Sequence, residues 1–455
     1  MYNPRDIDII PPLVQQYPPL GLMYLASHLA INRIDVKILD ACVLSLSPEQ
    51  VANEILNKDV SYVGFYTTMF NLWSVKRSID ILRDKSNVTI ILGGPHVTHF
   101  PKAIQELRAD FGVIGDGEIA LVELLQCLMD GDMERTKYVP NVVQYINGRV
   151  VIPHVRSIDN LDDLRFPDRY AVQPHLYSTP LHPGKMTTMV TSRGCPFDCF
   201  FCGLPNKNSF RRRSQKNAVQ EVFEIIDQGY NYIEIKDDIF TLHKEWVLDF
   251  CSMLAGNKHS IAWGCETRAD CVDFPLMMEM KKAGCTNIKF GIEAGSDRVR
   301  NGILGKQLKR HAIVRAFEDA KRVGLATMGY FILGSPSETH EEIRETMMLA
   351  NEIDPDYAEF HLMFPIAGSR CFKQMLQNGV LREDVFEKIA IGGRLPLCVS
   401  DNIDEAELIR CRKMAYRSFY FNPRRLMRYV RTSEGVKGLL KKAKAGHAIL
   451  WQMMR

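Results

Sequence analysis

The chain has 455 residues, of which 46% are hydrophobic and 24% charged, as in a globular protein with two domains and an appendage. Its formal net charge of +3 is too small to indicate nucleic-acid binding. No apolar stretch reaches the length of a membrane span and the first residues do not resemble a signal peptide, so we expect a cytoplasmic protein. Its twelve cysteines are therefore expected to be reduced thiols rather than a disulfide framework.

Residues 1–135 alternate short β-rich runs with helical patterns, which is typical of an open parallel sheet with helices on both faces. We expect strands at 36–39, 62–66, 88–92 and 111–114, and helices at 20–32, 48–57, 72–83 and 118–128. Glycine-rich turns follow the last two strands, in the order Gly93-Gly94-Pro95-His96 and Gly115-Asp116-Gly117-Glu118. Ligands of such sheets bind along that edge.

The next segment, 136–182, carries a hairpin signal at 142–145 and 150–152. Asn147-Gly148 between the two runs predicts a type I′ turn. The residues from 159 to 180 are rich in Asp and Pro, and we interpret them as a linker between domains.

Three cysteines, Cys195, Cys199 and Cys202, follow the apolar run 186–191 within one short loop. Three thiolates cannot all pair as disulfides, and soft sulfur ligands at these spacings suit an iron–sulfur cluster or zinc. A closed structural site would need a fourth protein ligand, so the count of three predicts an open coordination position. The other cysteines form no second CxxC motif, although Cys265 and Cys271 leave an auxiliary cluster open.

With the aromatic Phe201 before the third cysteine, this CxxxCxΦC motif resembles the hallmark of the radical S-adenosylmethionine (SAM) superfamily. The resemblance implies that Cys195, Cys199 and Cys202 hold a 4Fe-4S cluster whose fourth iron chelates the methionine moiety of SAM. An electron donor such as flavodoxin or ferredoxin would then trigger cleavage to a 5′-deoxyadenosyl radical. A structural zinc site or a chance cluster of cysteines is the alternative.

The alternation of strands and helices restarts after residue 185, with strands expected at 187–191, 232–236, 261–265, 287–292, 326–333 and 357–363. Six such units match the partial (β/α)6 barrel of the radical SAM superfamily, whose active residues lie at the carboxyl ends of the strands.

Polar or small residues fall at those strand ends. By resemblance, the segment with Asp237 and Asp238 receives the ammonium group of the SAM methionine moiety, although at most one of two adjacent side chains faces the barrel. Glu293 is expected near the ribose or the methionine carboxylate, and Arg268 is the expected counter-charge of that carboxylate. The tight turn at Gly334 is expected near the adenine.

The N-terminal turns, together with the run from Pro18 to Ala26, look like the cobalamin-binding domain that precedes the barrel in one branch of this superfamily. The resemblance implies corrin contacts from Leu20, Gly21, Thr67, Gly93, Gly94, Pro95, Gly115 and Glu118. We assign no axial cobalt ligand, and we interpret His96 as a hydrogen-bonded turn residue. Family members usually begin with a strand that ends in Asn-Pro-Pro, whereas Asn3-Pro4-Arg5 here follows only two residues, which leaves cobalamin retention open.

Two further features lie outside these motifs. We expect 211–213, a run of three arginines, to be a solvated turn rather than a substrate-phosphate site, and Tyr330 to be a core residue rather than a hydrogen donor. The basic stretch 419–455 has helical apolar spacing, and we favour a role in closing the barrel over contact with a membrane surface.

The predicted fold class is therefore α/β. It comprises a Rossmann-like cobalamin-binding domain (1–135), a hairpin and linker (136–182), a partial (β/α)6 TIM-like radical SAM barrel (183–365) and a C-terminal helical cover (366–455). The predicted function is cobalamin-dependent methylation of an unactivated centre in a small-molecule or natural-product substrate. The alternative is a radical SAM dehydratase, deoxygenase or cyclase whose first domain binds no cobalamin. A third interpretation is a non-catalytic iron–sulfur or cobalamin carrier.

Overall fold

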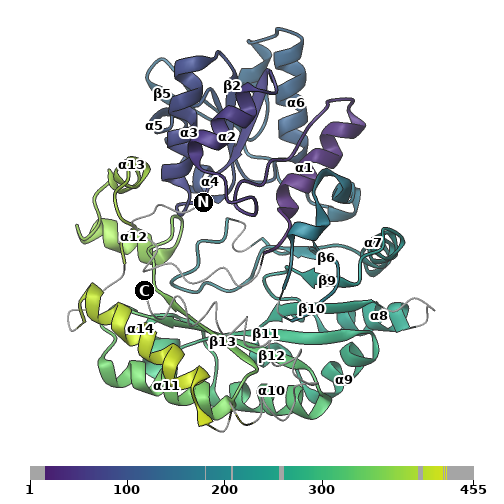
Figure 1. Ribbon diagram of the computed structural model, residues 1–455, viewed down its shortest axis with the longest axis vertical. Helices are drawn as coiled ribbons and strands as arrows, with labels where there is room; N and C mark the ends of the chain where they lie inside the picture. The colour runs from purple at the N-terminus through teal and green to yellow at the C-terminus, as the bar shows by residue number, and fades with distance from the viewer. Residues whose placement is uncertain are drawn as a thin grey trace.

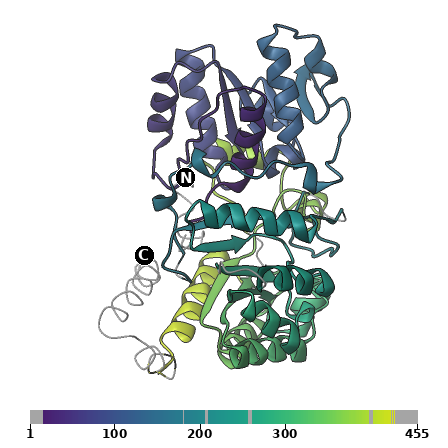
Figure 2. The same cartoon turned by 90° about the vertical axis from the view of Figure 1, so that its right-hand side faces the viewer.

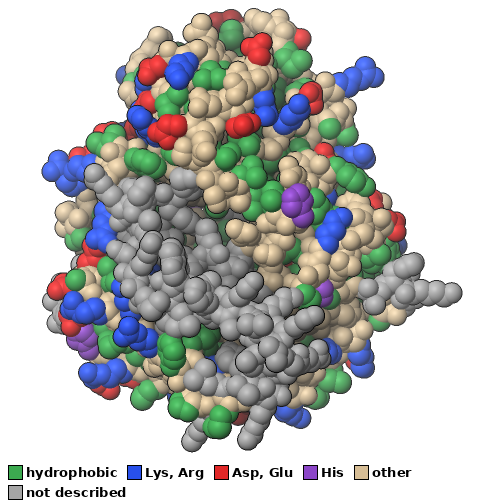
Figure 3. All heavy atoms as spheres, viewed as in Figure 1, with side chains coloured by type: hydrophobic (Ala, Val, Ile, Leu, Met, Phe, Trp, Pro, Cys, Tyr) green, Lys and Arg blue, Asp and Glu red, His purple; other side chains and the backbone are tan. Residues whose placement is uncertain are grey.

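The computed structural model describes residues 16–179, 181–205, 209–255, 261–397 and 403–423, together with Arg425 and Met427. Two sheet domains are stacked along the longest axis of the molecule (Figures 1 and 2). Within the described residues, no helix is long and apolar enough to cross a membrane. On the face shown in Figure 3, acidic and basic side chains are interspersed, in keeping with the small net charge.

The first sheet has the strand order β1-β2-β3-β4-β5. Its parallel strands are β1 (Tyr62–Tyr66), β2 (Thr89–Gly93) and β3 (Phe111–Val113), and β4 (Val142–Ile146) and β5 (Arg149–Val151) are antiparallel. The helices are α1 (Leu20–Ile31), α2 (Pro48–Leu56), α3 (Leu72–Lys85), α4 (Pro95–His99), α5 (Ala103–Glu106) and α6 (Glu118–Met129). The four helices predicted for this domain are confirmed as α1, α2, α3 and α6.

Alternation along β2 divides the apolar core between the two faces of this sheet. Ile90 and Leu92 pack with the buried residues of α3, whereas Ile91 packs with those of α1 and α6. Successive side chains of a strand point to opposite faces, so a run of apolar residues indicates a strand covered on both sides. The helices seen on either side of the sheet in Figure 1 provide that cover.

Two predictions for the first domain need correction. Residues 36–39 form no strand, because β1 pairs only with β2 among the described strands and 36–39 have no neighbour with which to share hydrogen bonds. The hairpin of β4 and β5, expected in the segment between the domains, belongs to the first domain instead. Its strand β4 pairs with β3 and therefore extends the first sheet. Its type I′ turn is confirmed by the positive φ angles of Asn147 (50°) and Gly148 (80°).

The second sheet has the order β13-β12-β11-β10-β9-β6, and all its pairings are parallel. Its strands are β6 (Met186–Met189), β9 (Tyr232–Ile235), β10 (Ala262–Thr267), β11 (Cys285–Glu293), β12 (Ala326–Leu333) and β13 (Tyr357–Leu362). The helices between them are α7 (Gln215–Asp227), α8 (Lys244–Ala255), α9 (Phe274–Lys282), α10 (Arg310–Val323) and α11 (His340–Ile353). The six predicted strands are thus confirmed, in the sequential order of a partial barrel.

The described part of the C-terminal segment covers the barrel edge and reaches the first domain. It contains α12 (Arg370–Gln377), α13 (Val385–Ala390) and α14 (Glu405–Tyr420). The Tyr416 hydroxyl accepts a hydrogen bond of 3.2 Å from the Phe360 backbone N–H, so α14 shields edge strand β13. Phe386 of α13 packs on His96 of α4, with ring centroids 4.6 Å apart. Most of the predicted basic stretch, from residue 428 on, lies outside the described residues, as do Asn3-Pro4-Arg5.

Candidate active site

The three motif cysteines line one pocket at the carboxyl end of the barrel strands. This pocket has a volume of about 640 Å³, and Cys195, Cys199, Phe201 and Cys202 contribute to its wall. Within the described residues, no three His, Cys, Asp or Glu side chains are grouped so as to hold a single metal ion. In a 4Fe-4S cluster each cysteine binds a different iron, so its ligands lie farther apart than those of one zinc ion. Three thiol ligands on one pocket wall are a ligand set that suits an iron–sulfur cluster.

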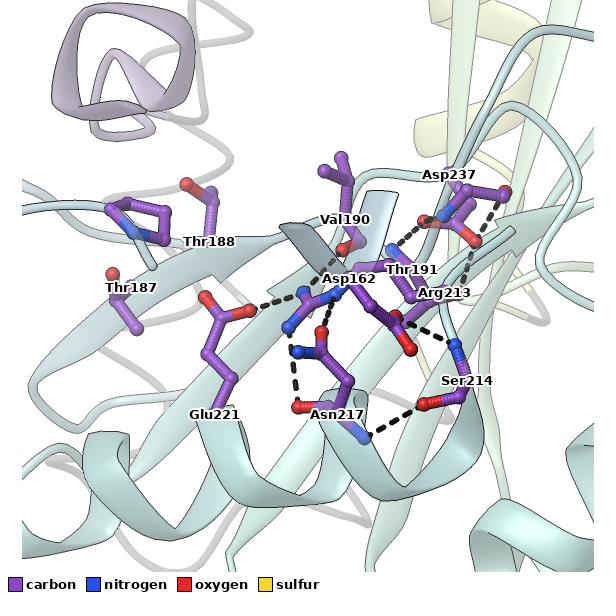
Figure 4. Close-up of polar contacts among 12 residues, drawn as sticks. Asp162, Thr187, Thr188, Val190, Thr191, Arg213, Ser214, Asn217, Glu221 and Asp237 are labelled. Carbon is purple, nitrogen blue, oxygen red and sulfur yellow. Dashed lines mark hydrogen bonds and ion pairs between the residues drawn. The ribbon is translucent and has the colours of Figure 1, made fainter. Parts of the chain in front are cut away.

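The start of the cysteine loop is fixed by Asp237, which follows β9 (Figure 4). Its carboxylate accepts hydrogen bonds from the backbone N–H groups of Thr191 and Ser192 at 2.6 and 3.2 Å. It also accepts from the hydroxyl groups of Thr191 and Ser192, at 2.5 and 2.6 Å. The structure thus places the Asp237 carboxylate against the loop and outside the pocket wall. Its role is to position the segment that leads to Cys195.

The adjacent Asp238 does line the pocket. Burial raises the pKa of its carboxyl to about 6, and the negative charges of Asp237 and Glu266 act in the same direction. Asp238 is therefore the member of the pair that can meet a positively charged ligand group.

Below the loop, a buried carboxylate is shared by two arginines. Glu221 of α7 lies 2.5 Å from Arg169 and also pairs with Arg213, and the three side chains are at most 3% exposed. Arg213 donates to the Val190 carbonyl at 2.8 Å, and Arg169 donates to that of Thr188 at 3.0 Å. Figure 4 shows Glu221 and Arg213 beneath the strand that leads into the cysteine loop. The ion-paired group thus supports the loop from the helix side.

These contacts overturn the expectation that the arginines at 211–213 form a solvated turn. Arg211 and Arg212 form strand β8 (Arg211–Arg212), which pairs with β7 (Ser192–Arg193). Arg212 lies 4.6 Å from the Trp246 ring, and Arg211 bonds Asp116 of the first domain at 2.6 Å. The sequence around these arginines does not reveal these contacts, because their acidic and aromatic partners lie elsewhere in the chain.

Arg268 and Glu293 lie in the pocket wall, as expected. Arg268 stacks 4.0 Å from the Phe197 ring and makes a two-point contact with Asp270, at 2.9 and 2.8 Å. Its Nη1 atom is buried and has no hydrogen-bond partner within the described residues, so a ligand in the pocket could accept from it. Glu293 has a φ angle of 71°, which is rare for a residue with a side chain and is often found at functional sites.

Lys306 is a pocket residue that the sequence analysis missed. Its ammonium group lies 2.7 Å from Glu293 Oε1, across a separation of 13 residues. No motif in the sequence links these two positions. Only the fold of the segment after β11 brings them together.

The remaining barrel residue, Gly334, lies outside the pocket wall. It has a φ angle of 89° and its backbone N–H donates to Glu338 Oε2 at 2.7 Å. Ser335 N–H donates to the same atom at 2.8 Å. Burial nevertheless raises the pKa of Glu338 to about 7. The turn is therefore organised by a carboxylate that the sequence analysis did not single out.

Tyr330, expected to be a core residue, lines the pocket instead.

Five of the expected corrin contacts lie along the carboxyl edge of the first sheet: Thr67, Gly93, Gly94, Pro95 and Gly115. The Thr67 hydroxyl donates to the Gly93 carbonyl at 2.7 Å. Gly94 has a φ angle of 99°, and a Cβ there would lie 2.8 Å from the Thr67 carbonyl oxygen. The turn requires glycine for both reasons.

The other expected corrin contacts are placed differently. Leu20 and Gly21 begin α1, where Leu20 packs with the apolar cluster around Tyr24 and Gly21 is exposed. The Glu118 carboxylate bonds Arg193 of the cysteine-loop region. His96 is not hydrogen-bonded through its ring as expected, because the ring is buried against Phe386 and neither ring nitrogen has a partner within the described residues. Burial lowers its pKa to about 3, so it is neutral at pH 7.

The sheet edge of the first domain docks directly on the cysteine loop. Arg193, just before the loop, bonds Asp116 at 2.9 Å, and the His99 ring lies 2.8 Å from the Gly203 carbonyl oxygen. Phe70, which follows β1, packs edge-on against Phe364 at 5.4 Å and lines the cysteine pocket. The pocket therefore has walls from both domains.

We expect the Asp116 contacts to make stability dependent on acid pH. Burial alone would raise the pKa of the Asp116 carboxyl, but hydrogen bonds from Arg211 and the Ile158 N–H, with the positive charges of Arg193 and Arg211, lower it below its usual value. A lowered folded-state pKa gives stability that is complete above the unfolded pKa of about 3.9 and is lost as the pH falls through the folded pKa. The unfolding midpoint should therefore fall more steeply below about pH 4 in the wild type than in Asp116→Asn. Parallel pH profiles would contradict this assignment.

Comparisons with known proteins divide the chain in the same way. Residues 9–125 match the model of the B12 binding domain, and residues 189–350 match that of the Radical SAM superfamily. An uncharacterized methyltransferase of Pyrococcus horikoshii is 30% identical over 441 residues, covering 93% of this chain and 94% of that protein. The anaerobic magnesium-protoporphyrin IX monomethyl ester cyclase of Rubrivivax gelatinosus is 26% identical, covering 89% of this chain and 74% of the cyclase.

A solved structure has a similar fold. It is a radical S-adenosylmethionine methyltransferase, TsrM, from Kitasatospora setae, solved with a tryptophan substrate and a SAM analogue. It superposes with a TM-score of 0.67 at 16% identity, covering 80% of this chain and 74% of that one. At this identity the likeness concerns the arrangement of the two domains.

Proposed function

Since the chain belongs to the radical SAM enzymes that carry an N-terminal B12-binding domain, we propose that it is a cobalamin-dependent methyltransferase acting on a small molecule. The observation that carries the proposal is the shared pocket, in which Phe70 of the first domain faces the same space as the three motif cysteines. A pocket walled by both domains lets one substrate be reached from the barrel and from the B12-binding domain. The protein would position the reactants and keep water out.

The residues of the pocket fit a 4Fe-4S cluster and SAM. In this proposal Cys195, Cys199 and Cys202 hold the cluster, and Asp238 receives the ammonium group of the methionine moiety. Lys306, already paired with Glu293, is the additional cation available to a carboxylate. Together, cluster and SAM supply the 5′-deoxyadenosyl radical when bound. A flavodoxin or ferredoxin is the proposed electron donor.

Arg268 lies beside the cysteine loop and is proposed to bind an anionic group in the pocket. Its guanidinium group stacks on Phe197, within the loop between Cys195 and Cys199, and its buried Nη1 has no hydrogen-bond partner within the described part of the chain. The two-point contact with Asp270 fixes its orientation. Arg268 is therefore suited to donate a hydrogen bond to the methionine carboxylate or to the cluster itself.

The strand-end turns of the first domain fit a large flat cofactor at the junction. The glycines at 93, 94 and 115 carry no side chain, and the Gly94 turn brings two strand ends into close contact. A ligand can thus approach the backbone at this edge. In this proposal Thr67, Gly93, Gly94, Pro95 and Gly115 lie against the corrin, which supplies the methyl group. Glu118 helps to dock the domain on Arg193 instead.

A radical cyclase without cobalamin is the second candidate function. It is favoured by the direct ion pairs of Arg193 and Arg211 with Asp116 and Glu118, which join the two domains through protein contacts. The similarity to a magnesium-protoporphyrin ester cyclase supports cyclisation as the reaction.

Anaerobic reconstitution with iron, sulfide and hydroxocobalamin tests the proposal. We expect the protein to retain the corrin through gel filtration, detected by its visible absorption, and to form 5′-deoxyadenosine from SAM under a strong reductant. With SAM labelled as trideuteromethyl, the label should appear on the bound corrin. Formation of 5′-deoxyadenosine without retained corrin would favour the cyclase candidate. A protein that binds the cluster but forms no 5′-deoxyadenosine would contradict both candidates.

A further inference from the structure

Charged side chains fill the barrel interior beneath the cysteine pocket, where branched apolar residues are usual. Lys289 lies 2.6 Å from Glu234, and both side chains are fully buried. The Tyr232 hydroxyl donates to Glu234 at 2.7 Å, and Lys236 pairs with Glu266. Buried ion pairs add little net stability compared with well-packed apolar residues. The proposed cluster and SAM sites use none of these side chains, so another role accounts for them better.

This polar interior opens into the cysteine pocket. Glu266, Lys289, Tyr330, Glu359 and His361 belong to the same pocket wall as the motif cysteines. Glu359 and His361 alternate along β13, with 3.2 Å between Glu359 Oε2 and His361 Nε2. Tyr330 is the partner of Glu359 in the register of β12 and β13. A substrate in the pocket therefore meets a wall of charged and polar groups.

The hydroxyl of Tyr330 is available to a ligand. It has no hydrogen-bond partner within the described residues, although its side chain lines the pocket. Its pKa is raised well above the usual value, first by burial and then by the negative charges of Glu266 and Glu359. The hydroxyl therefore stays protonated and lies in a negative electrostatic field.

Carboxylates outnumber ammonium groups in this region. Lys236 and Lys289 are the cations, and Glu234, Glu266 and Glu359 are the anions. These five side chains therefore carry one negative charge in excess. Such a wall attracts a cationic group and repels an anionic one.

An aromatic ring already lies against the same groups. Tyr17 precedes α1, and its segment is held by two backbone hydrogen bonds between Gln16 and Ser178, at 3.0 and 3.1 Å. The Tyr17 hydroxyl accepts from Lys289 at 2.7 Å, and its ring centroid lies 4.8 Å from the Lys236 ammonium. An aromatic body is thus compatible with the floor of the pocket, and Phe70 and Phe364 form an apolar wall above it.

We propose that the substrate of this enzyme carries a primary amine, whose ammonium group binds Glu359 and the Tyr330 hydroxyl in the field of Glu266. Its apolar body lies against Phe70 and Phe364. This rests on the proposed function, because it assigns the non-cofactor part of the pocket to the substrate. Substrates that present a phosphate or carboxylate to this wall are excluded by the same charges.

Three phenols of similar size test the inference on the full-length reconstituted protein with SAM present. Tyramine carries an ammonium group, 4-ethylphenol is neutral and 4-hydroxyphenylacetate is an anion. By titration calorimetry, tyramine should bind about tenfold more tightly than 4-ethylphenol, because one charge-assisted hydrogen bond contributes about that much affinity. The anion should bind more weakly than 4-ethylphenol. Glu359→Gln should remove about the same tenfold preference. Glu341→Gln, on the exposed side of α11, should leave it unchanged.

The amine proposal fails if tyramine does not bind to protein that binds SAM, if the anion binds as tightly, or if Glu359→Gln keeps the tyramine affinity. If Glu359→Gln does not fold, the relative affinities of the wild type for the three phenols test the amine site on their own. Formation of 5′-deoxyadenosine, measured on the same samples, separates this inference from the proposed function. Cleavage without a tyramine preference rejects only the amine site, whereas a tyramine preference without cleavage rejects only the enzymatic assignment.

Discussion

Cys199→Ala should fold normally and form no 5′-deoxyadenosine, a loss of at least about a thousandfold. Cys199 is buried and lies in the pocket wall with Cys195 and Cys202, so its removal leaves two of the three thiols proposed to hold the cluster. Iron content and the visible absorption of the reconstituted protein should fall in parallel. The alanine creates only a small cavity, so the unfolding midpoint of the protein without cluster should change little.

Cys271→Ala is the matched control. Cys271 is a free cysteine at the same end of the barrel but outside the pocket wall. Its loss should leave iron content and cleavage unchanged. If Cys199→Ala kept a full complement of iron and formed 5′-deoxyadenosine, the motif cysteines would not be the cluster ligands. Loss of iron in Cys271→Ala would revive the idea of an auxiliary cluster.

The largest expected effect on stability is that of Glu221→Gln. Glu221 is the shared carboxylate of Arg169 and Arg213, and its removal leaves two buried guanidinium groups without a counter-charge. Breaking a buried ion pair on one side costs about 3–5 kcal/mol. The barrel should therefore unfold at a clearly lower urea concentration. Trp246 is a suitable fluorescent reporter, because its indole N–H donates to the Arg213 carbonyl at 2.9 Å.

Glu224→Gln serves as the control on the same helix, α7, because Glu224 is exposed. It should change the free energy of unfolding by less than about 0.5 kcal/mol. Equal urea midpoints for Glu221→Gln and the wild type would mean that the two arginines find other partners. The cysteine loop, which rests on the Thr188 and Val190 carbonyls, would then be less dependent on this ion-paired group than the contacts indicate.

The features that sequence reasoning predicted well are those encoded by neighbouring residues. The spacing of Cys195, Cys199 and Cys202 indicated a common site because a short loop cannot separate them. Likewise, the Asn147-Gly148 pair determined its own turn, since both residues tolerate positive φ angles. The six barrel strands followed from their apolar composition and regular spacing.

What sequence reasoning missed depends on partners far apart in the chain. The Asp237 carboxylate bonds residues 45 and 46 positions earlier, so its role in holding the loop could not be distinguished from binding a cofactor. Arg211 bonds Asp116 across 95 residues. A run of basic residues gives no sign of such partners, and solvation is the default interpretation. Residues 36–39 were misassigned for a related reason, because a strand also requires a neighbour.

The contact between Tyr17 and Lys289 spans 272 positions, which has a consequence for synthesis on the ribosome. At about 5–20 residues per second, Lys289 emerges roughly 14–54 s after Tyr17. The first sheet can assemble during that interval, yet the segment beside it cannot reach its final place until β11 exists. Folding of this chain is therefore not a simple sequence of one domain after the other. One of the earliest described residues to be translated therefore makes this contact only after more than half of the chain has been synthesised.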